Sequence, residues 1–134
     1  MRNCKNCDKE IKGRADRKSC CGRICVLEYR QKIFIENWLA GLEKGNRGKV
    51  ATSKRIKTYL IQIRGNRCER CGWNQVNPYT NKVPIELEHV DGHWNNNHID
   101  NLILICPNCH SLTSTYRSLN TGKGRTYRKY ELAT

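Results

Sequence analysis

The fold is decided by residues 85–110, whose sequence is IELEHVDGHWNNNHIDNLILICPNCH. Apolar and polar residues alternate over 85–90, as in a half-buried strand, and Asp91-Gly92 is a strong turn signal. Residues 102–105 form a short apolar run that predicts a second strand. Pro107 suits the first turn of a helix, which we expect to continue through residue 116. The stretch therefore predicts a strand, a loop, a second strand and a helix in an α+β domain.

Nine cysteines occur in the chain, and six of them form Cys-x2-Cys pairs. The pairs are Cys4 with Cys7, Cys68 with Cys71, and Cys106 with Cys109. A two-residue gap lets both thiolates reach one ion from a tight turn, which is half of a tetrahedral zinc site. Small domains with a thin core need such a staple, and hydrophobic residues make up only 37% of this chain. Spacing and composition thus predict structural zinc.

Two zinc sites are expected. One would combine the two pairs that bracket the predicted strand, loop and strand, and its ligands would be Cys68, Cys71, Cys106 and Cys109. The N-terminal site would choose four ligands from five thiols, and those expected are Cys4, Cys7, Cys21 and Cys25. Cys20 is the alternative to Cys21. Four thiolates saturate a zinc ion, so both ions are predicted to be structural rather than catalytic.

The composition predicts a reducing compartment. Residues 1–23 contain no apolar run typical of a signal peptide, and nothing approaches the roughly eighteen apolar residues that span a bilayer. We therefore expect a cytoplasmic protein without a membrane partner, in which thiolates bind zinc rather than form disulfides.

The formal net charge of +13 is distributed unevenly. Residues 1–67 contain 18 lysines and arginines against 6 acidic residues, residues 68–116 contain 2 against 5, and residues 117–134 contain 5 against 1. A mildly acidic centre thus lies between two basic segments. Many of these cations are ordinary solvated surface, but so large an excess favours contacts to phosphates, driven by counterion release. We expect a nucleic acid as the partner.

Composition also divides the chain into four segments. Residues 1–40 are expected to be a zinc-binding segment with a helix, and residues 41–52 a basic, glycine-rich linker. Residues 53–119 are expected to form the main domain. The basic residues 120–134 predict an extended C-terminal arm.

Two helices are expected before residue 85. The first follows the N-terminal cysteines, and the residues predicted near one of its faces are Leu27, Phe34, Trp38 and Leu42. The second has apolar residues at i, i+3, i+4 and i+7, namely Ile56, Tyr59, Leu60 and Ile63. Thr52 or Ser53 is its expected cap, and Gly65 or Asn66 its expected stop. We interpret this second stripe as core.

The candidate catalytic residues flank the predicted strands and helix, and they are Glu88, His89, Asn101 and His110. Consecutive strand residues point to opposite faces, so Glu88 and His89 would share a site only if a twist or bulge ends the strand there. A hard divalent ion would take the Glu88 carboxylate and an imidazole nitrogen of His110, and would keep positions for phosphate and water. His89 could accept a proton from water at neutral pH.

Each residue also has a simpler interpretation. Glu88 alone could be a solvated carboxylate, and His110 could bind the structural zinc beside Cys109. A lone histidine is more often surface or core than catalytic, and this is our interpretation of His93 and His98. The combination, rather than any single member, favours a catalytic site.

The order of these motifs resembles the HNH nuclease family and its ββα-metal fold, over residues from about 56 to 119. The matching motifs are Glu88-His89-Val90-Asp91-Gly92, Asn96-Asn97, Asn101-Leu102 and Cys106-Pro107-Asn108-Cys109-His110. The resemblance implies that His89 is the general base and that Glu88 and His110 bind the catalytic metal. It implies that Asn101 holds the loop and helps to orient His89. Family members often have Asp or His at the position of Glu88, which is one methylene longer than Asp.

The resemblance further implies a DNA endonuclease that uses Mg²⁺, Mn²⁺ or Ni²⁺ and leaves 5′-phosphate and 3′-hydroxyl ends. One such site cuts one strand, so the product would be a nick, and double-strand cleavage would need two copies or two successive nicks. The zinc-binding N-terminal segment is similar to small endonucleases encoded by bacteriophages, which implies the cytoplasm of a bacterial host and, as candidate partners, phage packaging proteins. The alternative is a non-catalytic zinc ribbon that binds nucleic acid or assists packaging, which would leave the register of Glu88, Asn101 and His110 unexplained.

Overall fold

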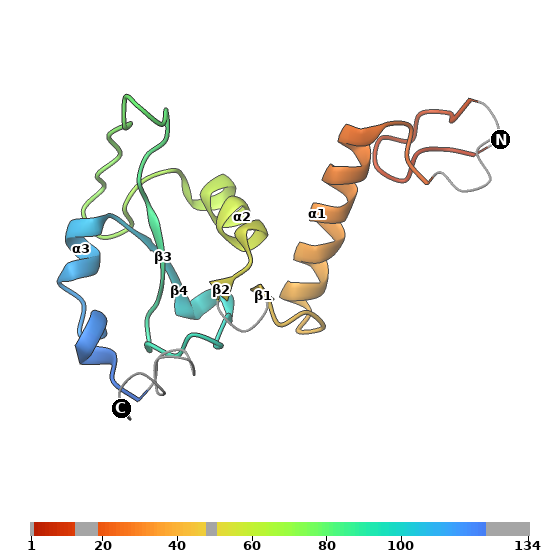
Figure 1. The fold of residues 1–134 in the computed structure, drawn as a ribbon. Helices are drawn as coiled ribbons and strands as arrows, with labels where there is room; N and C mark the ends of the chain where they lie inside the picture. The colour runs from red at the N-terminus through yellow and green to blue at the C-terminus, as the bar shows by residue number, and fades with distance from the viewer. Residues whose placement is uncertain (1, 13–18, 48–50, 123–134) are drawn as a thin grey trace, which may run out of the picture. The chain divides into compact units, whose positions relative to one another are not determined.

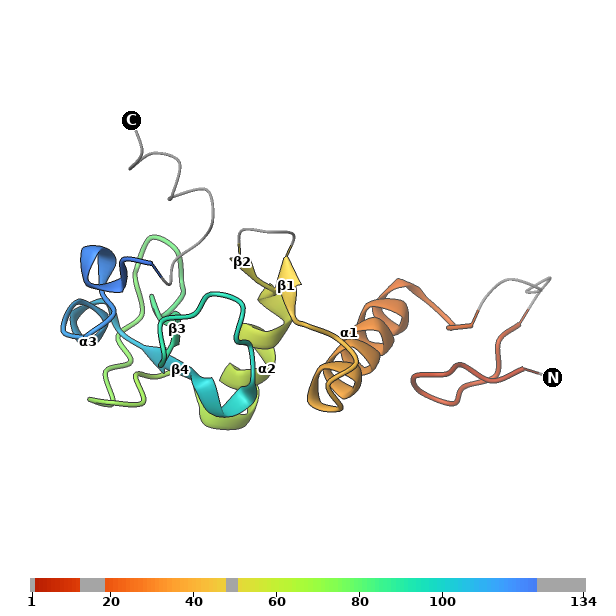
Figure 2. The ribbon, with the colours of Figure 1, turned by 90° about the horizontal axis from the view of Figure 1, so that it is seen from below.

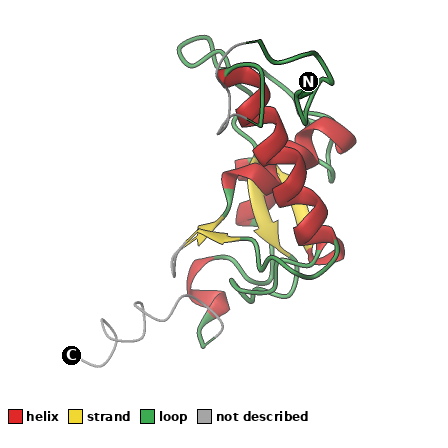
Figure 3. Ribbon diagram, turned by 90° about the vertical axis from the view of Figure 1, so that its right-hand side faces the viewer, coloured by secondary structure: helices red, strands yellow, loops and turns green. Residues whose placement is uncertain are grey.

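The computed structural model of the chain describes residues 2–12, 19–47 and 51–122. The chain divides into two compact units, Met1–Glu43 and Lys44–Thr134. The described residues form helices and two small antiparallel strand pairs (Figure 3), which confirms the predicted α+β class. Most of the predicted C-terminal arm, from residue 123 onward, lies outside the described residues. Within the described part of the chain, every helix is too short or too polar to span a bilayer.

In the first unit, a cysteine-rich segment precedes helix α1 (Arg23–Leu39), as Figure 1 shows. The helix buries Ile35 and Trp38, which are three residues apart and so lie on one face. The predicted apolar face is wrong at both ends, because Leu27 is 54% exposed and Leu42 is 81% exposed. The buried residues of α1 lie within about one turn of the helix, so the apolar spacing predicted a longer buried face than the helix has.

The second unit begins with a strand pair that composition did not predict. Strand β1 (Asn46–Arg47) runs antiparallel to β2 (Ala51–Thr52). Gly45, with φ of 78°, allows the chain to turn into this pair, and its carbonyl accepts a hydrogen bond from the Ser53 amide at 2.7 Å. The structure therefore differs from the linker expected over residues 41–52, because its second half contains paired strands.

Helix α2 (Lys54–Arg64) follows immediately. Ser53 is its N-cap, with the side-chain oxygen accepting from the Arg55 amide, and Gly65 ends it with φ of 93°, as predicted. Ile56 and Leu60 are fully buried. The predicted stripe is wrong at Ile63, which is 53% exposed.

The central element is the antiparallel pair of β3 (Glu86–His89) and β4 (Leu102–Ile105), in which Glu86 is opposite Ile105 and His89 is opposite Leu102. Helices α2 and α3 (Pro107–Ser111) lie on either side of this pair in both Figure 1 and Figure 2. Leu104 and Ile105 are fully buried, as are Ile56 and Leu60 of α2. The predicted order of strand, loop, strand and helix is confirmed.

Helix α3 is shorter than expected and ends at Ser111 instead of reaching residue 116. The amide and the hydroxyl of Thr113 both donate to the His110 carbonyl, at 3.1 and 2.9 Å. This carbonyl is therefore not available to continue the helical hydrogen-bond pattern. A short 3₁₀ turn, η2 (Arg117–Asn120), follows instead.

The loop between the strands ends in a second 3₁₀ turn, η1 (Ile99–Asn101). Arg64, at the end of α2, donates to the carbonyls of Leu102 at 2.6 Å and Ile99 at 3.1 Å. Its guanidinium also forms an ion pair with Glu69, with N and O 3.3 Å apart. These contacts fix the start of β4, and so the end of the loop, to helix α2.

Candidate metal and active site

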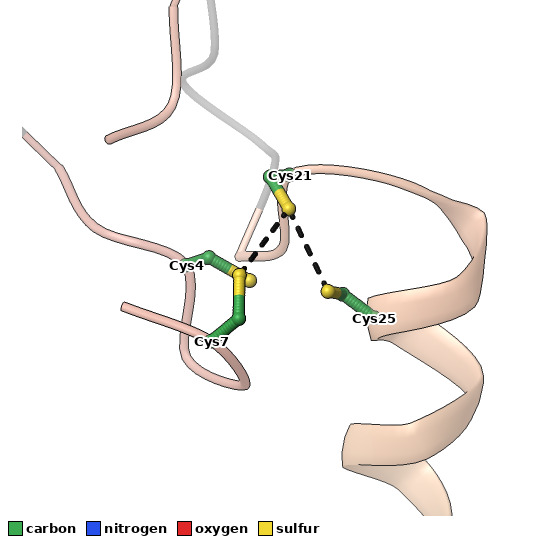
Figure 4. A group of neighbouring side chains, drawn as sticks. All are labelled: Cys4, Cys7, Cys21 and Cys25. Carbon is green, nitrogen blue, oxygen red and sulfur yellow. Dashed lines mark hydrogen bonds between the residues drawn. The ribbon is translucent and has the colours of Figure 1, made fainter. Parts of the chain in front are cut away.

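The N-terminal thiols converge as predicted (Figure 4). One ligand atom from each of four residues lies within 4.8 Å of the others, and the residues are Cys4, Cys7, Cys21 and Cys25. The Cys21 sulfur is 3.6 Å from that of Cys7 and 3.6 Å from that of Cys25. Four sulfurs about 2.3 Å from one zinc ion would be about 3.8 Å apart at the corners of a tetrahedron. The donor set therefore fits zinc, and Cys20 is buried outside it.

A second group of thiols gathers in the second unit and consists of Cys68, Cys71, Cys106 and Cys109. The sulfurs of Cys71 and Cys106 are 3.7 Å apart, again close to a tetrahedral edge. Cys106 is also the N-cap of α3, where its sulfur accepts from the Cys109 amide. Next to Cys68, the Glu69 amide donates to the Leu104 carbonyl at 2.8 Å. An ion in this group would thus connect the segment after α2 to the start of α3.

The thiols of each group differ in their pKa. Burial alone would raise the pKa of Cys4. Backbone hydrogen bonds from Cys7 and Cys21 outweigh this effect and lower the pKa to about 6. Its neighbour Cys21 has a pKa raised to about 12, chiefly by the side chains of Cys25 and Cys7. Four such sulfurs cannot all be thiolates at neutral pH without a cation among them. The two cysteine groups could each hold a zinc ion, which supplies that charge.

The same contrast occurs in the second group. Burial raises the pKa of Cys68, but backbone hydrogen bonds, the first from Cys71, lower it to about 6. The side chains of Cys106 and Cys71 raise the pKa of Cys109 to about 12. Both groups therefore share the property expected of zinc ligands that ionise together when the metal binds.

A cleft of 710 Å³ lies between β3, α3 and the β2–α2 junction. Three of the predicted catalytic residues line it, namely Glu88, His89 and His110. Basic side chains line it as well, and they are Lys54, Lys57 and Arg117. Asn101 is not among its lining residues. His93 and His98, interpreted above as surface or core residues rather than catalytic ones, are exposed and outside its lining.

Glu88 and His110 are in contact. Oε2 of Glu88 is 2.8 Å from Nε2 of His110, and Oε1 accepts a hydrogen bond from the Thr115 hydroxyl at 3.2 Å. The other ring nitrogen, Nδ1, contacts Oε2 of Glu86. Because Glu86 and Glu88 are two residues apart on β3, both carboxylates reach the same face of the strand pair and meet the imidazole from α3.

His89 points to the other face of β3 and contacts different residues. Its Nε2 is 2.8 Å from Oδ1 of Asn97 and 3.3 Å from the Thr52 hydroxyl, which itself donates to Asn97 Oδ1 at 3.0 Å. Strand β3 ends at His89, and Val90 begins the turn. The end of the strand lets both faces open into one cleft, so Glu88 and His89 line it together although they are adjacent in sequence.

Asn101 organises the loop. Its Oδ1 accepts from the Asp91 amide at 3.0 Å, and its Nδ2 donates to the Asp91 carboxylate at 2.9 Å and to the Asn96 carbonyl at 2.9 Å. Its backbone carbonyl accepts from the Val90 amide at 2.8 Å. Asn101 thus fixes the chain immediately after His89, whereas the side chains that contact the His89 ring belong to Asn97 and Thr52.

The carboxylate at the centre of this loop is strongly stabilised. Burial raises the pKa of Asp91, but hydrogen bonds from the Asn96 side chain, the His93 amide and the Asn101 side chain lower it more, to about 2. Asp91 is therefore a permanent anion under ordinary conditions, and it accepts from three donors at once. The loop geometry rests on this residue.

Four residues of the site were not identified in the sequence, and they are Thr52, Glu86, Asn97 and Thr115. Glu86 could have been found, because it alternates with Glu88 in the predicted strand and so shares its face. Asn97 lies within the motif on which the family resemblance depends, but it had no role attached to it. Thr52 and Thr115 come from other elements, and nothing in their local sequence indicates contact with the site.

Comparisons with known proteins agree with the family resemblance. The chain is 39% identical over 79 residues, 57% of its length, to a curated protein of Escherichia phage T5 named H-N-H endonuclease F-TflIV. The match covers 34% of that protein, so the chain spans about a third of the length of the curated relative it matches. No family model matches the chain. No solved structure matches it either. The similarity to the phage T5 protein supports the HNH endonuclease family, whereas the N-terminal zinc site rests on its four thiols.

Proposed function

We propose that this protein is a metal-dependent HNH endonuclease that hydrolyses phosphodiester bonds of DNA. The observation that carries the proposal is the contact of Glu88 with His110 in a cleft that His89 also lines. Positive charge at the cleft from Lys54 and Arg117 suits a phosphate backbone. The similarity to an endonuclease of phage T5 supports the same reaction class and DNA as the substrate.

The residues that would hold the catalytic divalent ion are Glu88 and His110. Two donors about 2.1 Å from one octahedral ion are about 3.0 Å apart when they occupy adjacent positions, and the separation of these two atoms is 2.8 Å. When bound, Mg²⁺, Mn²⁺ or Ni²⁺ would neutralise charge on the phosphate and on the leaving oxygen. The separation is therefore close to that of two adjacent ligands of such an ion.

Glu86 and Thr115 would orient these two ligands. With the metal bound, the Glu86 carboxylate would accept the Nδ1 proton of His110 and leave the lone pair on Nε2, the nitrogen beside Glu88. The hydroxyl of Thr115 donates a hydrogen bond to Oε1 of Glu88, so that Oε2 remains for the ion. Each ligand thus has one atom held by the protein and one atom available.

His89 would act as the general base. It would take a proton from the attacking water, whose oxygen bonds to phosphorus while the bond to the 3′ oxygen breaks. The products would carry 5′-phosphate and 3′-hydroxyl ends. Asn101 would hold the loop that follows His89, and a single site of this kind would nick one strand. The two zinc ions would be structural, one in residues 1–40 and one in a nuclease domain over residues 53–119.

The origin and surroundings of the protein are also part of the proposal. We infer a bacteriophage-encoded protein that acts in the cytoplasm of the bacterial host, since the curated relative belongs to a phage. The similarity to that relative says nothing of packaging proteins, so that partner rests on the family resemblance alone.

The test is cleavage of supercoiled plasmid by the zinc-loaded chain with added Mg²⁺ or Mn²⁺. Replacing His89 with alanine should slow cleavage by on the order of a hundred- to ten-thousand-fold. His93→Ala, an exposed histidine outside the cleft, is the matched control and should cleave normally. Full activity of His89→Ala would overturn the assignment of His89 as the general base, whereas no divalent-dependent cleavage by the wild type would favour the alternative of a non-catalytic zinc ribbon.

A further inference from the structure

The ring of His89 is held through one of its two nitrogens. Nε2 is 2.8 Å from Asn97 Oδ1 and 3.3 Å from Thr52 Oγ1. Within the described residues, Nδ1 has no hydrogen bond, and the ring lines the cleft. Which nitrogen carries the proton in the neutral ring therefore depends on whether the groups at Nε2 accept or donate.

The orientation of the Asn97 amide is determined independently of His89. Its Nδ2 donates to the backbone carbonyl of Lys44 at 3.0 Å and also to Oδ1 of Asn46. A carbonyl can only accept, so turning the amide over would place two oxygens against each other. Asn97 is only 5% exposed, and water could not relieve that repulsion. The Lys44 carbonyl therefore fixes Oδ1 of Asn97 toward His89.

Oδ1 carries no proton, so the hydrogen between it and His89 must come from Nε2. The Thr52 hydroxyl donates to the same Oδ1, at 3.0 Å, and its hydrogen is then not available to Nε2. We propose that Asn97 holds neutral His89 as the Nε2–H tautomer and thereby makes Nδ1 the nitrogen that accepts the proton of the attacking water. The tautomer depends on the hydrogen bonds alone, whereas the role of Nδ1 rests on the proposed nuclease function.

In the hydrolysis of a phosphodiester, an O–H bond of water breaks, its proton binds the lone pair of His89 Nδ1, and the water oxygen forms a bond to phosphorus. The bond from phosphorus to the 3′ oxygen breaks with its electron pair on that oxygen, which takes a proton from solvent. The imidazolium that results has two N–H groups, and the Nε2–H bond to Asn97 Oδ1 becomes charge-assisted. Asn97 acts through His89 and is a positioning residue.

The tautomer can be measured directly on the full-length, zinc-loaded chain by long-range ¹H–¹⁵N NMR at mildly alkaline pH, with His89 assigned by loss of its signals in His89→Gln. We expect His89 to give the Nε2–H pattern. The Nδ1–H pattern in the wild type would overturn the proposal, and this measurement needs no variant of Asn97 to fold. An Nε2–H pattern in a chain that cleaves no DNA would support the tautomer and overturn the proposed function instead.

Two variants test the cause. Asn97→Leu keeps a similar volume and removes the acceptor, so the Nε2–H pattern should be lost and plasmid cleavage should fall on the order of a hundred-fold. Thr52→Val keeps Asn97 as the acceptor and should retain the pattern. The matched control is Asn95→Leu, an exposed position in the same loop, which should change neither readout. Wild-type tautomer and cleavage in a folded Asn97→Leu would overturn the role of Asn97.

Discussion

Glu88 on β3 and His110 on α3 meet with Oε2 and Nε2 2.8 Å apart, although the whole loop and strand β4 separate them in sequence. The second cysteine group lies at the His110 end of this arrangement, since Cys106 caps the helix that carries His110 and Cys109 lies within it. The short helix therefore has two functions. Cys106 and Cys109 belong to a group of thiols that could hold one zinc ion, and His110 lines the cleft.

The contact of Glu86 with His110 Nδ1 leads to a first prediction. Glu86→Ala should weaken the binding of Mn²⁺ at the cleft by about ten- to a hundred-fold, because the imidazole loses the carboxylate that sets its tautomer and orientation. Glu86→Gln, which keeps an acceptor without the charge, should be intermediate. Electron paramagnetic resonance titration of free Mn²⁺ measures this affinity. Glu36→Ala, on the exposed side of α1, is the control and should bind Mn²⁺ like the wild type. A Glu86→Ala chain with the Mn²⁺ affinity of the wild type would contradict the orienting role of Glu86.

A second prediction concerns the thiols. The wild-type chain should contain two zinc ions, and Cys106→Ser should lose one of them and much of the thermal stability of the second unit, since structural zinc contributes folding free energy. Serine is itself a good N-cap, so the capping role of Cys106 at α3 is preserved and the loss reports on the metal. Elemental analysis and thermal melting provide the readouts. Cys20→Ser, a buried thiol outside both groups, should keep two ions. A Cys106→Ser chain with an unchanged melting temperature would rule out the predicted group.

The sequence predicted the central elements because their signals are local. Alternation over residues 85–90, the turn at Asp91-Gly92 and the proline of α3 each depend on a few neighbouring residues. The three Cys-x2-Cys pairs are also a local signal, since the two thiols of each pair are only three positions apart in the sequence. These features do not depend on what the rest of the chain does.

The parts that were missed depend on long-range contacts. Strands β1 and β2 are two residues long, too short for any alternation to be visible, and they form because Asn46 and Lys44 bind Asn97 far along the chain. For the same reason Thr52 resembled a helix cap and not a neighbour of His89. Helix α3 ends earlier than predicted because the Thr113 hydroxyl donates to the His110 carbonyl. The periodicity of apolar residues gives no sign of such a hydrogen bond.

The lowered pKa of Asp91 predicts how its contribution depends on pH. Its pKa falls from 3.8 to about 2 on folding, so its stabilisation is fully present above pH 3.8 and is lost only as pH falls through about 2. The free energy of unfolding should therefore be lower in Asp91→Asn than in the wild type by a difference that is constant between about pH 6 and pH 8. Urea denaturation at three pH values measures it. A difference that changes across this range would contradict the assigned ionisation of Asp91.

The last prediction concerns where the basic charge acts. Residues 44–67 contain 8 lysines and arginines and no acidic residue, whereas residues 1–43 contain 10 against 6. Most of the excess positive charge therefore belongs to the second unit, in which Lys54, Lys57 and Arg117 line the cleft. Deleting residues 1–43 should leave divalent-dependent cleavage intact at low salt. DNA binding should weaken moderately, and the slope of log affinity against log salt should become shallower by about one unit for each phosphate that the deleted residues neutralise.

Deleting residues 1–52 is the informative comparison, because it removes the three groups that hold Asn97 and His89 in place, namely the Lys44 carbonyl, Asn46 and Thr52. This shorter chain should still bind zinc through its own four thiols but should lose cleavage even at low salt. Salt titration of DNA binding and plasmid cleavage, run on the full chain and both truncations, separate the two effects. Equal affinities and slopes for the full chain and the 44–134 chain would mean that the first unit does not touch DNA, and its thiols and exposed leucines would then point to a protein partner. Full cleavage by the 53–134 chain would contradict the dependence of His89 on the strand pair.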